Sequence, residues 1–368
     1  MERSQTINRL SQSIMQFPIY KTKIEGINRT FDLNDPEDRK AYFELKAGPE
    51  LKKLRNYLKN SSFVAYLLGK KNSGKGTYSK LFMEAVGQKN INHVAVGDIV
   101  RDVHKSLGTK EGKKNPLNFL AKNYRGFHSL EEAVNLILTR SHNSLISSEL
   151  IIALIKYEIS KRPRQAIFID GFPRAHDQIN YSLYLKDLIG YRDDPDFFVF
   201  INVPDSIIDE RIKFRVVCPI CHTPRNLKLL PTKEIDYDKE SKNFYLMCDN
   251  PTCNKTRMIP KEGDELGIEP IRARLEIDNQ VFQKLLRLTG VPKIYLRNSI
   301  PKDVAKEYVD DYEITPQYNY EYNKRLGRVK IIEKPWLVKD DEGIESISLL
   351  PPAVVISFIK QTAQILKL

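Results

Sequence analysis

The chain has 368 residues, of which 41% are hydrophobic and 29% charged, a length that allows a sizeable core and more than one domain. No apolar run approaches 18 residues and no secretory signal opens the sequence, so we expect a soluble, cytoplasmic protein without membrane contact. The formal net charge of +12 suits polyanionic ligands and could also attract nucleic acid without specificity.

The first predicted elements are a helix and a strand. Residues 36–60 are rich in charge and predict a helix inside an N-terminal extension, 1–60, that is otherwise irregular. Residues 63–68 read Phe-Val-Ala-Tyr-Leu-Leu, which is too short for a typical helix and rich in aromatic and branched side chains. This run indicates a buried parallel strand that opens the core of the protein.

A glycine-rich loop, Gly-Lys-Lys-Asn-Ser-Gly-Lys-Gly-Thr, follows this strand directly. Glycines let the backbone approach an anion, and a predicted helix that ends at Gly87 adds its positive N-terminus. Lys75 supplies an ammonium group for phosphates, although Gly76 stands where the general pattern has Ser or Thr. A chance glycine-rich turn is the alternative. The predicted ATP-binding residues of the loop are Gly69, Asn72, Ser73, Gly74, Lys75, Gly76 and Thr77.

Three further predicted strands end in polar segments. The strand at 94–96 leads into Gly-Asp-Ile-Val-Arg, and the strand at 166–169 leads into Asp-Gly-Phe-Pro-Arg. The third, 197–203, is apolar and ends at a Pro-Asp pair. Ligands of open parallel sheets gather at the carboxyl ends of the strands, so these segments predict a phosphate and magnesium site.

The loop and these segments, in this order and spacing, resemble the adenylate kinase family of nucleoside monophosphate kinases. The family motifs are Gly-x-x-Gly-x-Gly-Lys-Gly-Thr, Gly-Asp-x-x-Arg and Asp-Gly-Phe-Pro-Arg, and the resemblance covers roughly residues 61–290. It implies an α/β, P-loop NTPase-type three-layer fold with a parallel sheet and two inserted subdomains. The implied parts are a kinase core with a C-terminal extension at 61–210 and 275–368, an enlarged monophosphate-binding insert at 97–148, and a lid at 211–274.

The resemblance also implies a role for each matching residue. The implied catalytic residues, which contact phosphoryl groups, are Lys75, Arg174, Arg215 and Arg274. The implied monophosphate site consists of Gly97, Arg101, Gly171, Arg174 and Gln178. Arg211 would stack on the ATP base, and Asp98 and Asp170 would position hydrated Mg²⁺. A lone arginine is usually a surface residue, but the placement of these after strands and at the lid borders favours phosphate binding.

The chain departs from the family pattern at three places. Lys71 and Asn72 stand where the family commonly has Pro-Gly, and asparagine tolerates a positive φ. Ahead of the lid exit an Asp-Glu pair is present, but the family's arginine is not, and only Arg257 or Lys261 could replace it after a shift. Val96 stands where adenine-selective members usually have Thr, so AMP is the favoured acceptor but GMP, CMP and UMP stay open.

All four cysteines of the chain lie within the predicted lid, in two close pairs. Such pairs separated by a polar segment predict a tetrahedral thiolate site for structural Zn²⁺. The second pair is wider than in the family, and a disulfide or four inert thiols are the alternatives. His222 could replace one ligand, although with four cysteines it is more readily an ordinary lid residue. The predicted ligands are Cys218, Cys221, Cys248 and Cys253.

The remaining segments carry fewer signals. The insert contains five lysines that indicate a solvated face more than a nucleic-acid site, namely Lys105, Lys110, Lys113, Lys114 and Lys122. Near the end, 344–350 predicts the last sheet strand and 351–366 a closing helix with proline at its start. The tyrosine-rich segment 308–336 carries no recognised motif.

The resulting hypothesis is a monomeric kinase that moves the γ-phosphoryl group of Mg-ATP to a nucleoside monophosphate, AMP being favoured. One alternative is a GMP, UMP or CMP kinase of the same fold. The other is a basic, zinc-containing P-loop protein that binds RNA or acts in an assembly, a hypothesis that rests on the net charge and the two extensions.

Overall fold

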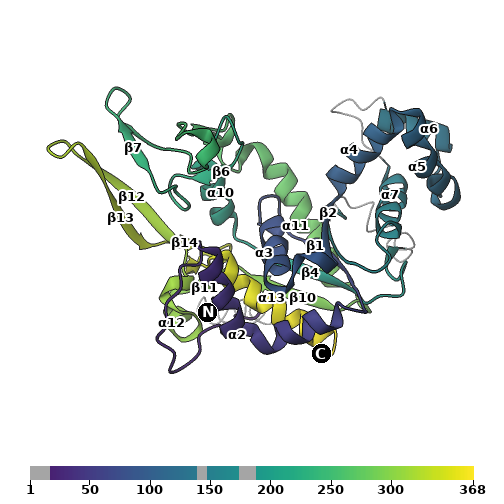
Figure 1. Ribbon diagram of the computed structural model, residues 1–368, viewed down its shortest axis with the longest axis horizontal. Helices are drawn as coiled ribbons and strands as arrows, with labels where there is room; N and C mark the ends of the chain where they lie inside the picture. The colour runs from purple at the N-terminus through teal and green to yellow at the C-terminus, as the bar shows by residue number, and fades with distance from the viewer. Residues whose placement is uncertain (1–16, 139–146, 174–187) are drawn as a thin grey trace, which may run out of the picture. The chain divides into compact units, whose positions relative to one another are not determined.

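The computed structural model describes residues 17–138, 147–173 and 188–368 (Figure 1). The chain forms two compact units, each assembled from separate stretches of sequence. The core unit comprises 43–201, 275–296 and 355–368, and the lid unit comprises 1–42, 202–274 and 297–354. None of the helices in these described ranges combines the length and the hydrophobicity needed to cross a lipid bilayer.

A five-stranded sheet forms the centre of the core unit. Its strands, in their order across the sheet, are β10 (Lys293–Arg297), β4 (Asp196–Asn202), β1 (Val64–Leu68), β3 (Ala166–Asp170) and β2 (Ile91–Ala95). The pairs β1 with β3, β1 with β4 and β2 with β3 are parallel. Every residue of β1 is buried, as expected of a central strand covered on both faces.

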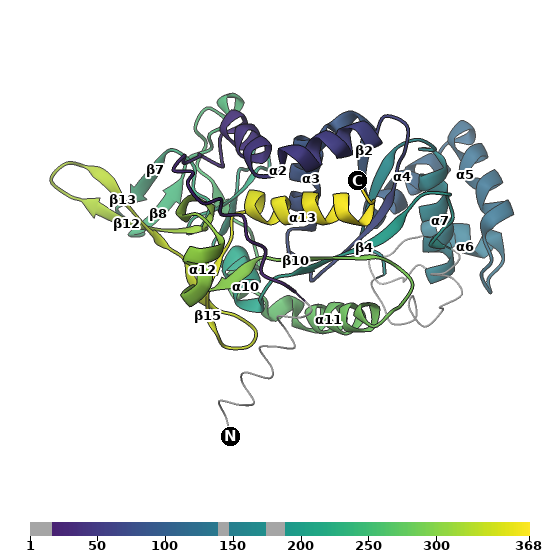
Figure 2. The same ribbon diagram turned by 90° about the horizontal axis from the view of Figure 1, so that it is seen from below.

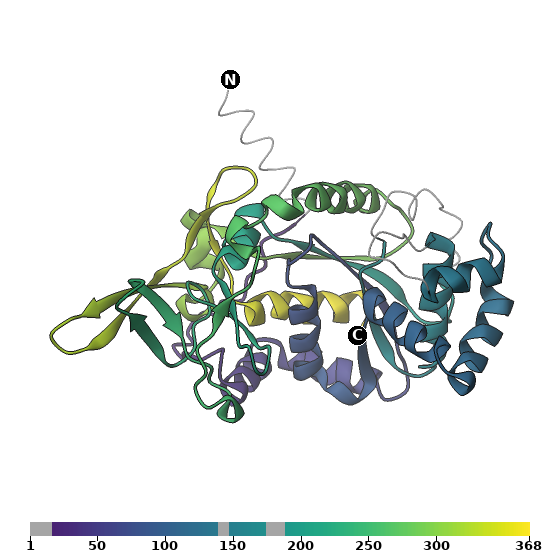
Figure 3. The same cartoon turned by 90° about the horizontal axis from the view of Figure 1, so that it is seen from above.

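Helices cover both faces of this sheet. On one face Phe168 of β3 packs against Phe82 of α3 (Lys75–Val86) and Phe358 of α13 (Pro351–Ile365). On the other, Phe200 of β4 meets Phe282 of α11 (Arg272–Leu286) edge to face, with ring centroids 5.0 Å apart. Figures 2 and 3 show α13 and α11 as separate layers with the sheet between them. The predicted three-layer α/β fold is confirmed.

The insert after β2 is helical. Its helices in the described residues are α4 (Val96–Leu107), α5 (Lys110–Asn123) and α6 (Leu130–Leu138), and α7 (Ser148–Ser160) leads back to the sheet. Side chains cap two of them: Thr109 accepts the Gly112 amide and Ser147 accepts the Leu150 amide.

The middle of the lid unit consists of one short helix and small antiparallel sheets. Helix α10 (Asp205–Lys213) is followed by β5 (Arg215–Val217), which pairs with β6 (Pro224–Asn226) and β9 (Ile259–Pro260). A hairpin of β7 (Ile235–Asp238) and β8 (Asn243–Leu246) projects from it. Short 3₁₀ turns follow at η2 (Pro251–Cys253), η3 (Asp264–Leu266) and η4 (Glu269–Ile271).

Residues 17–42 of the N-terminal extension and residues 297–354 of the C-terminal extension belong to this same unit. The later one contains β11 (Ser299–Pro301), α12 (Lys302–Tyr308), the turn η5 (Asp311–Glu313), β14 (Leu337–Lys339) and β15 (Glu345–Ser348). It also contains the antiparallel hairpin of β12 (Pro316–Asn323) and β13 (Arg328–Pro335), which lies beside the β7–β8 hairpin (Figures 1 and 2). The segment without a recognised motif is therefore mostly this hairpin.

Two predicted helices are confirmed, whereas one predicted strand belongs to a different sheet. The charged helix is α2 (Pro36–Tyr57), interrupted by a non-helical backbone at Ala47, and the closing helix is α13. The prediction that 344–350 is the last strand of the central sheet is wrong: β15 pairs with β11 and β14, and β10 is the fifth strand of that sheet. Strand β10 alternates buried and half-buried residues, so it lacks the continuous apolar run that marks the interior strands.

Candidate functional site

The glycine-rich loop between β1 and α3 has the backbone its sequence predicts. Asn72 and Gly74 adopt left-handed conformations, with φ of +65° and +91°. Gly69 has no room for a side chain, because an added Cβ would lie 2.8 Å from Ser73 Oγ and 2.9 Å from the Ile201 carbonyl oxygen. The tight start and the left-handed turns curl the loop before α3, as an anion-binding loop requires.

Lys75 is the first residue of α3, and its side chain folds back over the loop. Its Nζ donates to the carbonyl oxygens of Gly69 and Lys70 at 2.9 and 3.0 Å, and it lies 3.9 Å from Asp170 Oδ1. Gly74 is the N-cap of this helix and has no side chain to cap it, and the first turn contains no acidic residue. The positive end of α3 and the Lys75 ammonium are therefore suited to hold an anion.

Sheet register places Asp170 beside this loop. Asp170 ends β3 and lies level with Leu67 of β1 and Ala95 of β2. The glycine-rich loop begins two residues after Leu67, and α4 begins directly after Ala95. The three segments that the sequence singled out therefore meet at the carboxyl edge of one sheet.

Several buried polar atoms at this edge have no hydrogen-bond partner within the described residues. They are Ser73 Oγ, Asp170 Oδ1 and His93 Nε2. His93 Nε2 lies 4.0 Å from Asp170 Oδ2, and burial lowers the pKa of His93, which favours its neutral form. Unpartnered buried polar atoms are costly unless a ligand or water satisfies them, and carboxylate oxygens suit hydrated Mg²⁺. The Asp170 carboxylate, with its buried oxygen, therefore fits a magnesium ion that is held through water molecules.

Sequence reasoning missed His93. Strand residues of mixed polarity gave no sign that this imidazole faces Asp170, because the contact depends on the pairing of β2 with β3.

The first two turns of α4 carry three candidate residues, Gly97, Asp98 and Arg101. Arg101 donates to Asp98 in an exposed ion pair between positions one helical turn apart. A Cβ at Gly97 would lie 3.6 Å from Arg101 Nη1, which is an ordinary contact, so the structure itself does not require glycine there. The arginine and the aspartate predicted for different ligands therefore bind each other here.

The segment after β3 is described only in part. Gly171 has a φ of +90°, a conformation that favours glycine, and the Phe172–Pro173 peptide is cis. Arg174 and Gln178 lie outside the described residues, so their predicted roles stay predictions.

The lid arginines lie in or beside the helices α10 and α11, at the borders of the predicted lid. Arg215 follows α10 and donates to both carboxylate oxygens of Asp264, at 2.5 and 2.7 Å. Arg211 lies within α10 and Arg274 in the first turn of α11, and both are partly buried. The bidentate pair fixes the Arg215 guanidinium in one orientation.

Arg257, one of the two residues considered for the missing lid arginine, is occupied elsewhere. It pairs with Asp238 at 3.2 Å and its guanidinium lies 4.0 Å from the centre of the Tyr245 ring. It stabilises the β7–β8 hairpin, and Lys261 is exposed.

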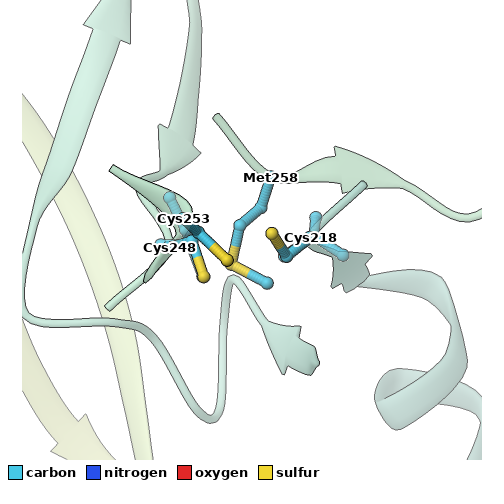
Figure 4. Packing of buried hydrophobic residues seen from close by; sticks show 6 residues of the cluster. Cys218, Cys248, Cys253 and Met258 are labelled. Atoms are coloured by element: carbon cyan, nitrogen blue, oxygen red, sulfur yellow. The ribbon is translucent and has the colours of Figure 1, made fainter. Parts of the chain in front are cut away.

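The four cysteines form one cluster. Their sulfur atoms all lie within 4.8 Å of one another, and Figure 4 shows three of them gathered beside Met258. All four are free thiols, so the disulfide alternative is wrong. Burial raises the pKa of Cys248 to about 12, whereas hydrogen bonding with Thr223 lowers the pKa of Cys221 to about 6. The four sulfur atoms fit the ligand set of a tetrahedral metal ion. His222 does not belong to this group of potential ligands.

The wide spacing of the second cysteine pair has a local explanation. The extra residues form the 3₁₀ turn η2, which is capped by the Asn250 side chain and ends at Asn254 with a φ of +47°. The Cys248 amide donates to the Thr256 carbonyl at 2.9 Å, which closes the turn. The turn folds the chain back, so that Cys253 reaches Cys248 in spite of the longer spacing.

Comparison with known proteins gives similarity to bacterial adenylate kinases, while no family model matches the chain. The chain is 29% identical over 218 residues to the adenylate kinase of Thermotoga petrophila, which covers 58% of this chain and 80% of that protein. It is 27% identical over 221 residues to the adenylate kinase of Mycoplasma mobile, with 60% and 82% covered. It is 28% identical over 221 residues to the adenylate kinase of Clostridium novyi, and this match covers 60% of this chain and 83% of that protein.

Proposed function

We propose, from the premise that this chain is related to the adenylate kinase family, that it is a nucleoside monophosphate kinase. It would transfer the γ-phosphoryl group of Mg-ATP to an acceptor for which AMP is favoured. The observation that carries the proposal is the position of Lys75, at an uncapped helix N-terminus and 3.9 Å from the partly buried Asp170 carboxylate. The relatives support a phosphotransferase, and this geometry supports the proposal that the loop binds its phosphates.

Phosphoryl transfer asks a protein to align two nucleotides and to neutralise charge on the phosphate oxygens. Here the loop amides and the N-terminus of α3 would bind the ATP phosphates. Lys75 would leave the carbonyl oxygens of Gly69 and Lys70 and follow the transferring group. No general base is needed, because the acceptor phosphate is already an anionic nucleophile.

The magnesium ion would be held through its water molecules. Asp170 offers a buried carboxylate oxygen that accepts no hydrogen bond from the described residues and lies 3.9 Å from Lys75 Nζ, and Asp98 adds a carboxylate from α4. The ion, when bound, neutralises phosphate charge and orients the phosphates for transfer. Neutral His93 limits the positive charge at this edge and leaves the Asp170 carboxylate to the ion.

The acceptor site follows from the family motifs. Its proposed residues are Gly97, Arg101, Gly171, Arg174 and Gln178. For the acceptor phosphate to bind, Arg101 would exchange its exposed pair with Asp98 for the phosphate, which also frees Asp98 for the magnesium shell. Exposed ion pairs contribute about 1 kcal/mol or less, so a doubly charged phosphate can replace this one.

The lid would contribute to ATP binding and exclude water. Its proposed phosphate and base contacts are Arg211, Arg215 and Arg274. We propose that the cysteine cluster holds a structural Zn²⁺, because four protein ligands leave no position for a reacting water. Bound zinc would supply a rigid centre to a lid built from strands of two to four residues.

The decisive experiment measures ADP formation from Mg-ATP with AMP, GMP, CMP or UMP, for the native protein and for Lys75→Ala. We expect acceptor-dependent turnover, fastest with AMP, that falls at least about 100-fold in the variant because a transition-state charge partner is lost. Preference for another acceptor would keep the chemistry and change the substrate. Folded protein that shows salt-dependent RNA binding and no acceptor-dependent turnover would contradict the kinase proposal.

A further inference from the structure

A long-range hydrogen bond joins the ATP-binding loop to α11. The backbone amide of Lys71 donates to Asp278 Oδ2 at 2.9 Å, between residues 207 positions apart. Both residues belong to the core unit. Asp278 lies in the second turn of α11, on the helix face that carries the buried Leu275 and Phe282, and is only partly buried. No motif in the sequence indicates this contact.

The bond holds an exposed corner of the loop. At one end Gly69 is wedged against the Ile201 carbonyl, and at the other Gly74 opens α3. Between them the chain makes a turn closed by the Ser73 amide, which donates to the Lys70 carbonyl at 3.1 Å. Lys71 is at the corner of that turn, and Asp278 is the acceptor that holds the corner.

The turn also carries strain that an anchor can offset. Asn72 directly follows Lys71 and has a φ of +65°, a conformation that side chains other than glycine adopt at a cost. A hydrogen bond to an ionised carboxylate is among the stronger hydrogen bonds in proteins. The bond to Asp278 therefore favours the curled loop over conformations in which Asn72 relaxes.

We propose that Asp278 is a positioning residue for ATP binding: its carboxylate anchors the Lys71 amide and holds the loop in the shape that receives phosphates. This inference rests on the proposed function, because it takes the loop to be the ATP site. This hydrogen bond needs a residue other than proline at position 71, because proline has no amide hydrogen to donate. Lys71 stands where the family commonly has proline. Preorganisation of this kind lowers the free energy cost of ordering the loop when ATP binds.

The test measures ATP dissociation constants, KM values for ATP and acceptor, and kcat for the full chain. Asp278→Ala removes the acceptor, whereas Asp278→Asn keeps a carbonyl oxygen. Lys71→Pro removes the donor, whereas Lys71→Ala keeps it and removes only the ammonium. Glu276→Ala, which deletes the same charge from an exposed position of the same helix, is the matched control.

We expect Asp278→Ala and Lys71→Pro each to weaken ATP binding about threefold to tenfold, with the acceptor KM and the melting temperature unchanged. The double variant should be no weaker than either single variant, because both remove one bond. Asp278→Asn should restore most of the affinity, and Glu276→Ala should bind ATP like the native protein. Lys71→Ala is the reference for Lys71→Pro, which should bind ATP about threefold to tenfold more weakly than Lys71→Ala. Additive losses, or ATP binding that Asp278→Ala leaves unchanged or tightens, would overturn the proposal.

Failure of the proposed function gives a different pattern. If ATP binding depends on Lys75 but no acceptor supports turnover, the kinase proposal fails, while the ATP dissociation constants of the Asp278 and Lys71 variants still decide the role of Asp278. If ATP binding does not respond to Lys75→Ala, both proposals are overturned.

Discussion

The two units of this protein are stabilised in different ways. The core unit contains a sheet whose central strand is wholly buried, covered by aromatic side chains from helices on both faces. The middle of the lid unit has strands of two to four residues, and its small core consists half of cysteines. A large apolar core can fold from burial alone, whereas a small one needs additional links.

Those links in the lid unit come from the extensions as well as from the cysteines. The rings of Tyr237 and Tyr322 stack with centroids 4.5 Å apart, and Tyr320 OH donates to the Leu227 carbonyl at 2.5 Å. The Tyr318 amide donates to the Lys228 carbonyl at 2.8 Å. The hairpin of β12 and β13 therefore braces the lid, and the similarity to adenylate kinases, which covers about 60% of the chain, leaves room for such an addition.

The first way to sharpen this comparison is to remove the metal from the lid. We expect zinc chelation or Cys253→Ser to unfold β5, β8 and β9 while the central sheet persists, because thiolate-bound zinc commonly supplies roughly 10 kcal/mol to small domains. Hydrogen exchange on the full chain, together with zinc content, measures both regions at once.

The matched control for the metal is Met258→Leu, which changes the same buried cluster without touching a sulfur ligand. It should cost less than about 1.5 kcal/mol and leave the zinc content intact. Two results together would contradict the metal proposal: protein that contains no zinc, and hydrogen exchange in the lid that chelators leave unchanged.

The second test concerns the fully buried Glu313, which joins the two extensions. Its carboxylate accepts from Thr22 Oγ1 at 2.7 Å, from Tyr42 OH at 2.5 Å and from the Asp310 amide at 2.7 Å. Glu313→Ala leaves these donors without this acceptor, so we expect a loss of about 3 to 5 kcal/mol in the free energy of unfolding.

Glu313→Gln keeps one acceptor oxygen and should lose clearly less, which chemical denaturation of the two variants will compare. The loss should appear as faster hydrogen exchange in residues 17–33 of the N-terminal extension. Equal exchange there in native and variant protein would show that Glu313 does not hold the extension.

The third test uses pH and probes the core unit. Asp196 begins β4, and burial raises the pKa of its carboxyl to about 6. The native state therefore binds this proton more tightly than the unfolded state, so stability falls as pH rises from about 4 to 6 and stays lower above that. The size of the effect is about 2 to 3 kcal/mol.

Asp196→Asn stays neutral and keeps an oxygen for the Gly190 amide, so we expect it to be more stable than the native protein at pH 7 and equal to it near pH 4. Urea denaturation at both pH values measures this. A native stability that is flat between pH 4 and 7 would contradict the raised pKa of Asp196.

Sequence reasoning succeeded where the determinants are local. The glycine-rich loop, its strand and α3 follow from neighbouring residues, and the left-handed conformation of Asn72 is one that its residue type tolerates. It failed for β10, whose place in the sheet depends on pairing with β4. It also missed His93 and Asp278, because their contacts join residues 77 and 207 positions apart.

Two features combine local determinants with contacts that sequence reasoning did not predict: the cysteine cluster, and the ion pair of Asp98 with Arg101 on α4. The close pairs predicted a cluster, which the structure confirms, but the turn that compensates for the wider second pair depends on Asn250 and Asn254. The pairing of Asp98 with Arg101 was visible in their i, i+3 spacing, yet the family motif directed attention to ligands instead.

The smallest expected effect tests whether the hairpin really braces the lid. Tyr322→Ala removes the ring that stacks on Tyr237 and should cost about 1 kcal/mol, because an aromatic pair of partly exposed rings contributes about that much. Tyr322→Phe keeps the ring and should behave as the native protein, so the pair of variants separates stacking from the hydroxyl. Hydrogen exchange in β7 and β8 is the measurement, with β1 and β3 as internal reference. If the hairpin braces the lid, Tyr322→Ala speeds exchange in β7 and β8 alone; if exchange there is unchanged, the stacked rings are a surface contact without consequence for the lid.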